Sequence, residues 1–251
     1  MRLSALMTVF NEADFIDYAI RGCLPYVDDL VIVEGAYKET IFLGQPARSS
    51  DGTLEIIEKY KNEPKVHVLY ANEQTDKDQR NVGLKKIKEL NPDGWTIIID
   101  GDEIYKPPTF QIIKNLTKNF DKQGIKASYF RSITFVNDLD HYCYQDFPRL
   151  FKITPECQFI NDNFMSWKDA KWTPPFITQT PSIKYYHYSF AKRKERIELK
   201  KRWWETRFGT EFDYGWHLKD NKWTDKGHTI YKFIGTHPEI LDIHKLVGQN
   251  G

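Results

Sequence analysis

Strands and helices alternate regularly through the first 120 residues, and this alternation constrains the fold more than any other feature. Each apolar, β-prone run is followed by a segment with apolar residues at helical spacing. The predicted strands are residues 2–10, 30–34, 65–70 and 95–100, and the predicted helices are about 14–24, 51–62, 76–90 and 107–120. This order predicts an α/β fold, with a mostly parallel sheet, helices on both faces and right-handed connections.

Acidic or amide side chains follow all four predicted strands. They are Asn11 and Glu12, then Glu34, then Asn72 and Glu73, and finally Asp100, Asp102 and Glu103. Because open parallel sheets bind ligands outside the carboxyl ends of their strands, these side chains are expected to share one edge. Polar loops are common in any protein, but acidic or amide groups after every strand favour a binding site.

The segment TIIIDGDEIY (96–105) places Asp100, Asp102 and Glu103 within four residues. Like charges this close repel one another, so a positive partner is expected among them. Mg²⁺ or Mn²⁺ takes oxygen ligands and leaves positions that a diphosphate can complete. The segment therefore predicts a divalent metal ion. An ordinary tight turn is the alternative, since Asp and Gly are common turn residues.

Five segments, taken in order, resemble successive motifs of family 2 glycosyltransferases with the GT-A fold. They are LMTVFNEADFIDYAI, LVIVEGA, SSDGTLEII, QRNVGL and IIIDGDE, and they cover about residues 2–105. The resemblance implies one GT-A domain over residues 1–251, with a Rossmann-like sheet and a smaller acceptor-side β/α region. Residues 1–105 would be the nucleotide-sugar-binding half, and residues 106–251 the acceptor-binding half with C-terminal helices.

The resemblance also implies roles for individual residues. The matching positions are Phe10 and Glu12 in the first nucleotide-contacting turn, Glu34 at the base or ribose, Arg80 near the nucleotide, Asp100 near the ribose and Asp102 on the metal. In similar proteins a histidine placed like His187, in YYHYSF, is a further metal ligand. Packing among the neighbouring tyrosines is an equal alternative for His187.

One departure from the family's pattern concerns residues 35–50. They separate the second predicted strand from the DGT segment, where the family usually has a compact turn. This insertion lies beside the expected site. A lid, an acceptor-binding loop and a plain surface loop all remain open as interpretations.

The alternation ends after residue 121, and the second half reads differently. Strands are predicted in 126–136, 147–153 and 181–190. Seven of the eleven residues from Lys192 to Arg202 are basic. Such a segment suits a diphosphate, a solvated helix face, or peripheral contact of 192–202 with an anionic membrane.

These features lead to one main hypothesis. The chain is expected to be a metal-dependent glycosyltransferase that moves a sugar from a nucleotide-diphosphate sugar to a hydroxyl of a glycan, lipid-linked or protein acceptor, with inversion. Similar enzymes use an acidic residue of the second half as general base. The candidates are Glu156, Asp162 and Asp169, and Asp162 is favoured because it follows PRLF at about the expected distance.

The sequence has two rival interpretations. A sugar-1-phosphate nucleotidyltransferase should have a glycine-rich, basic turn after the first strand, and VFNEADF has neither glycine nor a basic residue. A non-catalytic module that binds carbohydrate or polyanions remains the alternative.

Composition sets further limits. The 36 basic and 35 acidic residues nearly balance, which argues against specific nucleic-acid binding. Cys23, Cys143 and Cys157 show neither metal-knuckle spacing nor a disulfide framework, so a reducing compartment is expected. Charged residues follow LSALMTVF at once, without a cleavage site, and a cytoplasmic location is therefore expected.

Overall fold

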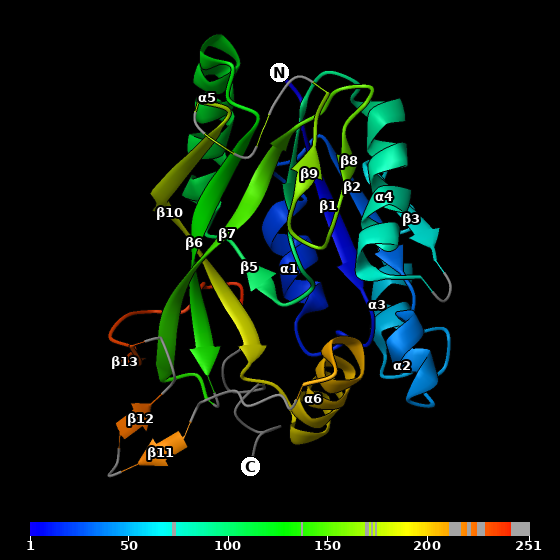
Figure 1. Cartoon of the computed structure of the whole chain (residues 1–251), viewed down its shortest axis with the longest axis vertical. Helices are drawn as coiled ribbons and strands as arrows, with labels where there is room; N and C mark the ends of the chain where they lie inside the picture. The colour runs from blue at the N-terminus through cyan, green and yellow to red at the C-terminus, as the bar shows by residue number, and fades with distance from the viewer. Residues whose placement is uncertain are drawn as a thin grey trace.

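The computed structural model describes residues 1–71, 74–136, 138–168, 171, 173, 175–210 and 229–241, and the backbone of 217–219 and 222–224. The elements in chain order (Figure 1) are β1 (Leu3–Val9), α1 (Ile16–Cys23), β2 (Asp29–Glu34), α2 (Lys38–Phe42), α3 (Thr53–Glu58), β3 (Val66–Tyr70), α4 (Asp76–Leu90), β4 (Trp95–Ile98), β5 (Glu103–Ile104), α5 (Pro107–Gln123), β6 (Ala127–Val136), β7 (His141–Lys152), β8 (Gln158–Phe159), β9 (Met165–Ser166), β10 (Ile177–Phe190), α6 (Lys194–Phe208), β11 (His217–Lys219), β12 (Lys222–Thr224) and β13 (Tyr231–Lys232).

The first half forms the parallel sheet that the alternation predicts. β1 lies between β2 and β4 and is parallel to both, and β3 extends the sheet beyond β2. The strand order is therefore β3-β2-β1-β4, and the direction of chain progression reverses between β1 and β4. The α/β prediction is confirmed. The helix expected over 51–62 is shorter than predicted, because α3 spans Thr53–Glu58.

The second half continues the same sheet instead of forming a separate body. β7 pairs antiparallel with β4 and with β6, and β10 runs parallel to β6. The end of β10 then pairs antiparallel with the short β5, which sets His187 opposite Glu103. After β10 the described residues contain one helix, α6, where the resemblance implies several.

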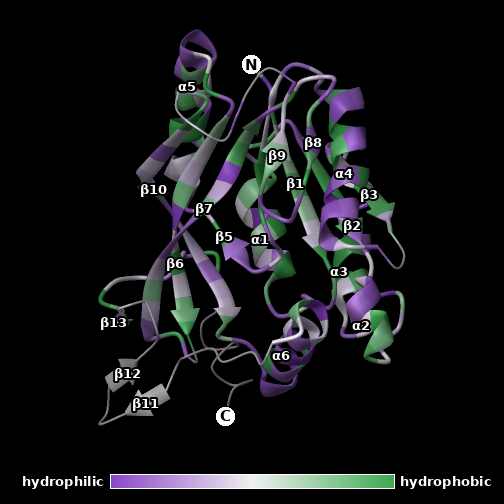
Figure 2. Ribbon diagram, in the orientation of Figure 1, coloured by the Kyte–Doolittle hydropathy of each residue, from purple (hydrophilic) through white to green (hydrophobic). Residues whose placement is uncertain are grey.

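Helices cover both faces of the parallel strands. Residues of α1, α3 and α5 share a core cluster with Ala5 and Met7 of β1, whereas α4 shares the opposite cluster with Leu6. β1 and β2 are buried at every position, and most of their residues are apolar. Figure 2 shows the contrast between these buried strands and the helices, because α4 and α6 carry much more hydrophilic colour than β1. Within the described ranges, no helix combines the length and apolarity needed to cross a bilayer.

α4 packs very closely on the sheet and carries Asp76 and Arg80 to the edge of the sheet where the cavity lies. The helix begins with a capping box, in which Thr75 and Asp78 bond each other's backbone amides. A Cβ atom at Gly83 would lie only 2.2 Å from Leu6 Cδ1 and 2.9 Å from Val33 Cγ2. Glycine at this position therefore sets the distance between α4 and the sheet, and with it the position of Arg80 one turn earlier.

We expect Gly83→Ala to lower the free energy of unfolding by about 1–3 kcal/mol, because the added methyl group overpacks the contact with Leu6 and Val33. Urea denaturation checks this value. Gly22→Ala in α1 is the matched control, since its Cβ would meet no atom closer than 3.8 Å. An unchanged midpoint for Gly83→Ala would show that α4 can move away from the sheet.

Candidate active site

A cavity of about 220 Å³ lies at the carboxyl ends of β1 and β4, where the order of the parallel strands reverses. Its walls come from the turns after these two strands, from the start of α4, from the end of β10 and from α6. α6 lies across the edge at which β1 ends (Figure 1). Open α/β sheets bind their ligands in this position.

Residues 100–103, here called the acidic turn, fold back on themselves. The Glu103 amide donates to the Asp100 carbonyl (2.9 Å), and the Asp100 amide donates to the Glu103 carboxylate (3.2 Å). Asp100 lines the cavity, whereas Glu103 is fully buried behind it. A Cβ at Gly101 would lie 3.0 Å from Glu12 Cβ, so glycine allows the acidic turn to approach Glu12 closely.

Two arginines neutralise Asp100 and Glu103. Arg80 Nη2 lies 3.1 Å from Asp100 Oδ1, and Arg149 Nη2 lies 2.9 Å from Asp100 Oδ2 and also contacts the Glu103 carboxylate. Burial opposes ionisation of Asp100, but the two guanidinium groups outweigh it and lower the pKa of Asp100. Burial raises the pKa of Glu103 to about 7, against the pull of Arg149.

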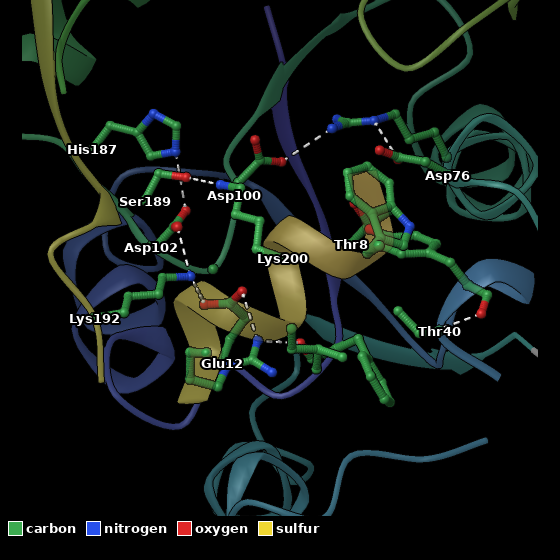
Figure 3. Close-up of a pocket in the computed structure, with 17 residues that line it drawn as sticks. Thr8, Glu12, Thr40, Asp76, Asp100, Asp102, His187, Ser189, Lys192 and Lys200 are labelled. Atoms are coloured by element: carbon green, nitrogen blue, oxygen red, sulfur yellow. Dashed lines mark hydrogen bonds and ion pairs between the residues drawn. The ribbon is translucent and has the colours of Figure 1, made fainter. Parts of the chain in front are cut away.

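Asp102 has a different cationic partner. Lys192, in the junction between β10 and α6, places Nζ 2.7 Å from Asp102 Oδ2 and 2.5 Å from Glu12 Oε2 (Figure 3). His187 Nε2 lies 3.4 Å from Asp102 Oδ1. Burial opposes the ionisation of Asp102, but Lys192 and His187 outweigh it and hold its pKa well below the usual range. For Glu12 burial prevails and raises the pKa.

The turn after β1 directs Glu12 into the cavity. Asn11 adopts a left-handed conformation with φ of 53°, which asparagine tolerates better than most residues. Its amide donates to Ser49 Oγ (2.7 Å), and its side-chain oxygen accepts from the Ser50 amide (2.8 Å). The 35–50 insertion thus braces the site through its last residues, and Tyr37 and Thr40 of the same insertion line the cavity.

Asp76 and Arg80 lie one turn apart on α4. Arg80 Nε lies 3.1 Å from Asp76 Oδ1, and both residues line the cavity. Burial, only partly offset by Arg80, raises the pKa of Asp76 to about 6. A raised carboxyl pKa is the direction of shift that suits a general base, so Asp76 is a candidate for that role.

One face of α6 points into the cavity with Arg196, Lys200 and Trp203, at helical spacing. Arg196 Nη2 donates to the Phe10 carbonyl (3.1 Å) and lies 3.5 Å from Glu12 Oε1. Lys200 donates to the Ser189 hydroxyl. Burial lowers the pKa of Lys200 to about 8, which leaves it mostly charged at neutral pH.

The structure brings most of the site residues proposed from the sequence together. Those that line the cavity are Phe10, Glu12, Arg80, Asp100, Asp102 and His187. Glu34 does not line it. Glu34 is fully buried, and its carboxylate accepts from the Ser49 amide (2.8 Å), so it supports the insertion instead. The individual roles of all these residues stay predictions.

None of the three candidates for the general base is found among the residues that line the cavity in the described part of the chain. Asp162 does not line the cavity, and Arg207 Nη2 lies 2.6 Å from both of its carboxylate oxygens. The charge of Asp162 is among the causes of the raised pKa of Asp76. Glu156 is exposed. Asp169, together with Asn72 and Glu73 after the third strand, lies outside the described residues.

Sequence reasoning missed two contributors and generalised a third. Arg149 is the buried partner of Asp100 and Glu103, and the only signal for it is a charge inside the apolar run FPRLFKI. Asp76 resembles any acidic residue in the first turn of a helix. The sequence marks the basic segment 192–202 only as a whole, whereas Arg193 pairs with Asp14 (2.9 Å) and does not line the cavity.

The residues around Asp102 do not fit a divalent cation in this arrangement. Lys192 contacts one oxygen of Asp102, and His187 faces the other. Within the part of the chain that the structure describes, no three His, Cys, Asp or Glu side chains gather in a way suited to holding a metal ion. The metal role of Asp102 and His187 stays a prediction, and a lysine supplies the positive charge beside Asp102.

Comparison with known proteins gives similarity of structure only. No family model matches the chain, and no curated protein matches it. Among solved structures, S. aureus TarS 1–349 has a TM-score of 0.47 at 14% identity, covering 85% of this chain and 67% of that chain. TarS 1–349 in complex with UDP has a TM-score of 0.40 at 19% identity, and the match covers 54% of this chain and 36% of that chain. A 4-diphosphocytidyl-2C-methyl-D-erythritol synthase has a TM-score of 0.38 at 12% identity, covering 61% and 74%. The chain spans 22% of the length of TarS itself, 36% of TarS 1–349 in complex with UDP and 35% of TarS 1–349 in complex with UDP-GlcNAc.

We expect Arg149→Met to lower the free energy of unfolding by about 3–5 kcal/mol at pH 8, because it leaves Glu103 buried without its guanidinium partner. The pKa of Glu103, already raised to about 7, should rise further in this variant. A raised carboxyl pKa favours the folded state at low pH, and this contribution is lost as the pH rises through the folded value. The loss of free energy of unfolding in Arg149→Met, relative to wild type, should therefore be smaller at pH 5.5 than at pH 8.

Urea denaturation at the two pH values measures this difference. Arg131→Met is the matched control, since Arg131 also pairs with a carboxylate but in an exposed bridge to Asp146. A deficit for Arg149→Met that is the same at both pH values would show that Glu103 is not the group left uncompensated.

Proposed function

We propose that the chain is a glycosyltransferase of the GT-A type, which moves a sugar from a nucleotide-diphosphate sugar to an acceptor hydroxyl. One observation carries the proposal: the cavity at the strand-order reversal sets carboxylates of β-strand turns against the cationic face of α6. Carboxylates suit ribose hydroxyls, and clustered Lys and Arg side chains suit a diphosphate. The ordered motifs over residues 2–105 support the same assignment.

The cavity divides into two sides in this proposal. Asp100, fixed by Arg80 and Arg149, binds the ribose, and Phe10 and Tyr37 provide apolar surface for the base. The diphosphate lies toward α6, where Arg196 and Lys200 face the cavity. The side chains of Lys192, Arg196 and Lys200 all point inward. The 192–202 segment therefore has fewer charges for contact with an anionic membrane than its sequence indicates.

The transfer step breaks the bond between the anomeric carbon and the β-phosphate oxygen, and its electron pair leaves on the diphosphate. The acceptor oxygen bonds the anomeric carbon from the opposite face, with inversion, and its proton passes to a carboxylate. Asp162 is our candidate for this base. Asp76 is the rival, because it lines the cavity with a pKa raised to about 6.

We expect the protein to release nucleoside diphosphate from one class of donor when UDP-, GDP- and dTDP-sugars are supplied with a mixture of hydroxyl acceptors. Arg80→Met should abolish this release, since it frees Asp100 and Asp76 from their shared guanidinium. Lys85→Met, exposed on the same helix, is the control and should behave as wild type. Binding of a donor without release under any condition would identify a non-catalytic module.

Two further variants test the general base. Asp162→Asn should lower kcat by about 10²–10⁴ while leaving the affinity for nucleoside diphosphate unchanged, because a general base acts only in the transfer step. Asp76→Asn should have the smaller effect on kcat. The reverse order of effects would transfer the role of general base from Asp162 to Asp76.

A further inference from the structure

Lys192 occupies the place in this site that a bound cation would take. The residue lies between the end of β10 and the start of α6, and its side chain is only 6% exposed. Its Nζ lies 2.7 Å from Asp102 and 2.5 Å from Glu12, two carboxylates that come from the turns after different strands. Figure 3 shows the ammonium group between these two side chains. Without a cation there, the buried Asp102 carboxylate and the partly buried Glu12 carboxylate would face each other.

Within the described residues, one donor of the ammonium group has no partner and is available to a ligand. Lysine has three N–H donors, and the contacts with Asp102 and Glu12 use two of them. A divalent ion bound to Asp102 would lie beside this ammonium group, and like charges at that distance repel. The cation at the acidic turn is therefore supplied by the chain itself.

The same segment carries two further cations toward the cavity. Lys200 donates to the Ser189 hydroxyl, and within the described residues no carboxylate lies at ion-pair distance from it. Arg196 divides its contacts between the Phe10 carbonyl and a longer approach of 3.5 Å to Glu12. Both side chains thus have capacity for an anion that enters the cavity, and a diphosphate carries that charge.

We infer that Lys192 is the resident cation of this site, and that Lys192, Arg196 and Lys200 together bind the donor's diphosphate without a divalent metal ion. This inference rests on the proposed function, because it assigns the leaving diphosphate of that reaction to the three basic side chains. It replaces the metal expected from the acidic turn. Asp102 and Glu12 become positioning residues, which hold Lys192 in place.

Calorimetric titration tests the inference on the full chain. UDP, GDP, dTDP and inorganic pyrophosphate are titrated in EDTA and again in Mn²⁺. We expect at least one nucleoside diphosphate to bind with the same affinity, within about twofold, in both buffers. Lys192→Met should weaken that binding about tenfold or more, because a charge-assisted contact is lost. Lys201→Met, on the same helix but outside the cavity lining, is the matched control and should bind as wild type.

A second measurement does not depend on nucleotide binding. Removing the Lys192 ammonium group leaves Glu12 and Asp102 without their shared cation, so Lys192→Met should melt at a lower temperature than wild type, and Mn²⁺ should not change the melting temperature of wild type. Wild-type binding that is abolished by EDTA and restored by Mn²⁺ would overturn the inference and leave the proposed function standing. Failure of every nucleotide to bind in either buffer would overturn both. The wild-type titrations decide between these outcomes even if the variant does not fold.

Discussion

The buried charges around the acidic turn are the interaction on which the rest of the structure depends. Three carboxylates within four residues are stable there only because Arg80, Arg149 and Lys192 reach them. Each of these cations comes from a different part of the chain: α4, β7 and the junction before α6. Removing one partner of such a buried pair is costly, so the charges fix where these elements lie relative to the turn.

The same charges join the two halves of the sequence. The resemblance divides the chain at residue 105, but the sheet continues from β4 into β7, and β5 pairs with β10. Arg149 of β7 and His187 of β10 therefore meet the turn that ends the parallel strands. The cavity is built from both halves: the first half supplies the turns after β1 and β4, and the second half supplies the end of β10 and the basic residues of α6.

The parallel half of the fold was predictable because its signals are local. Alternating apolar runs reveal strands and helices, and the rule for strand ends then brings Glu12, Asp100 and Asp102 to one edge. The partners of these residues were harder to predict, because an ion pair between residues distant in sequence depends on strand register. Arg149 sits in a strand that reads as apolar, and Glu34 ends a strand like a site residue yet lies beneath the insertion. His187 lies 3.4 Å from Asp102, and the cation beside them is a lysine from the next segment.

α6 differs from the other long helices because none of its residues is fully buried. Its attachments are mostly ionic or polar, through Arg196 to Glu12, Lys200 to Ser189 and Arg207 to Asp162, with Trp203 against Tyr37. Apart from the contact between Trp203 and Tyr37, the position of α6 therefore depends on charge more than on apolar burial. In the proposed function, the incoming diphosphate meets cations that carboxylates and a hydroxyl of the protein already hold in place. Because these ion pairs are largely buried, added salt screens them much less than it screens the approach of an anion from solution.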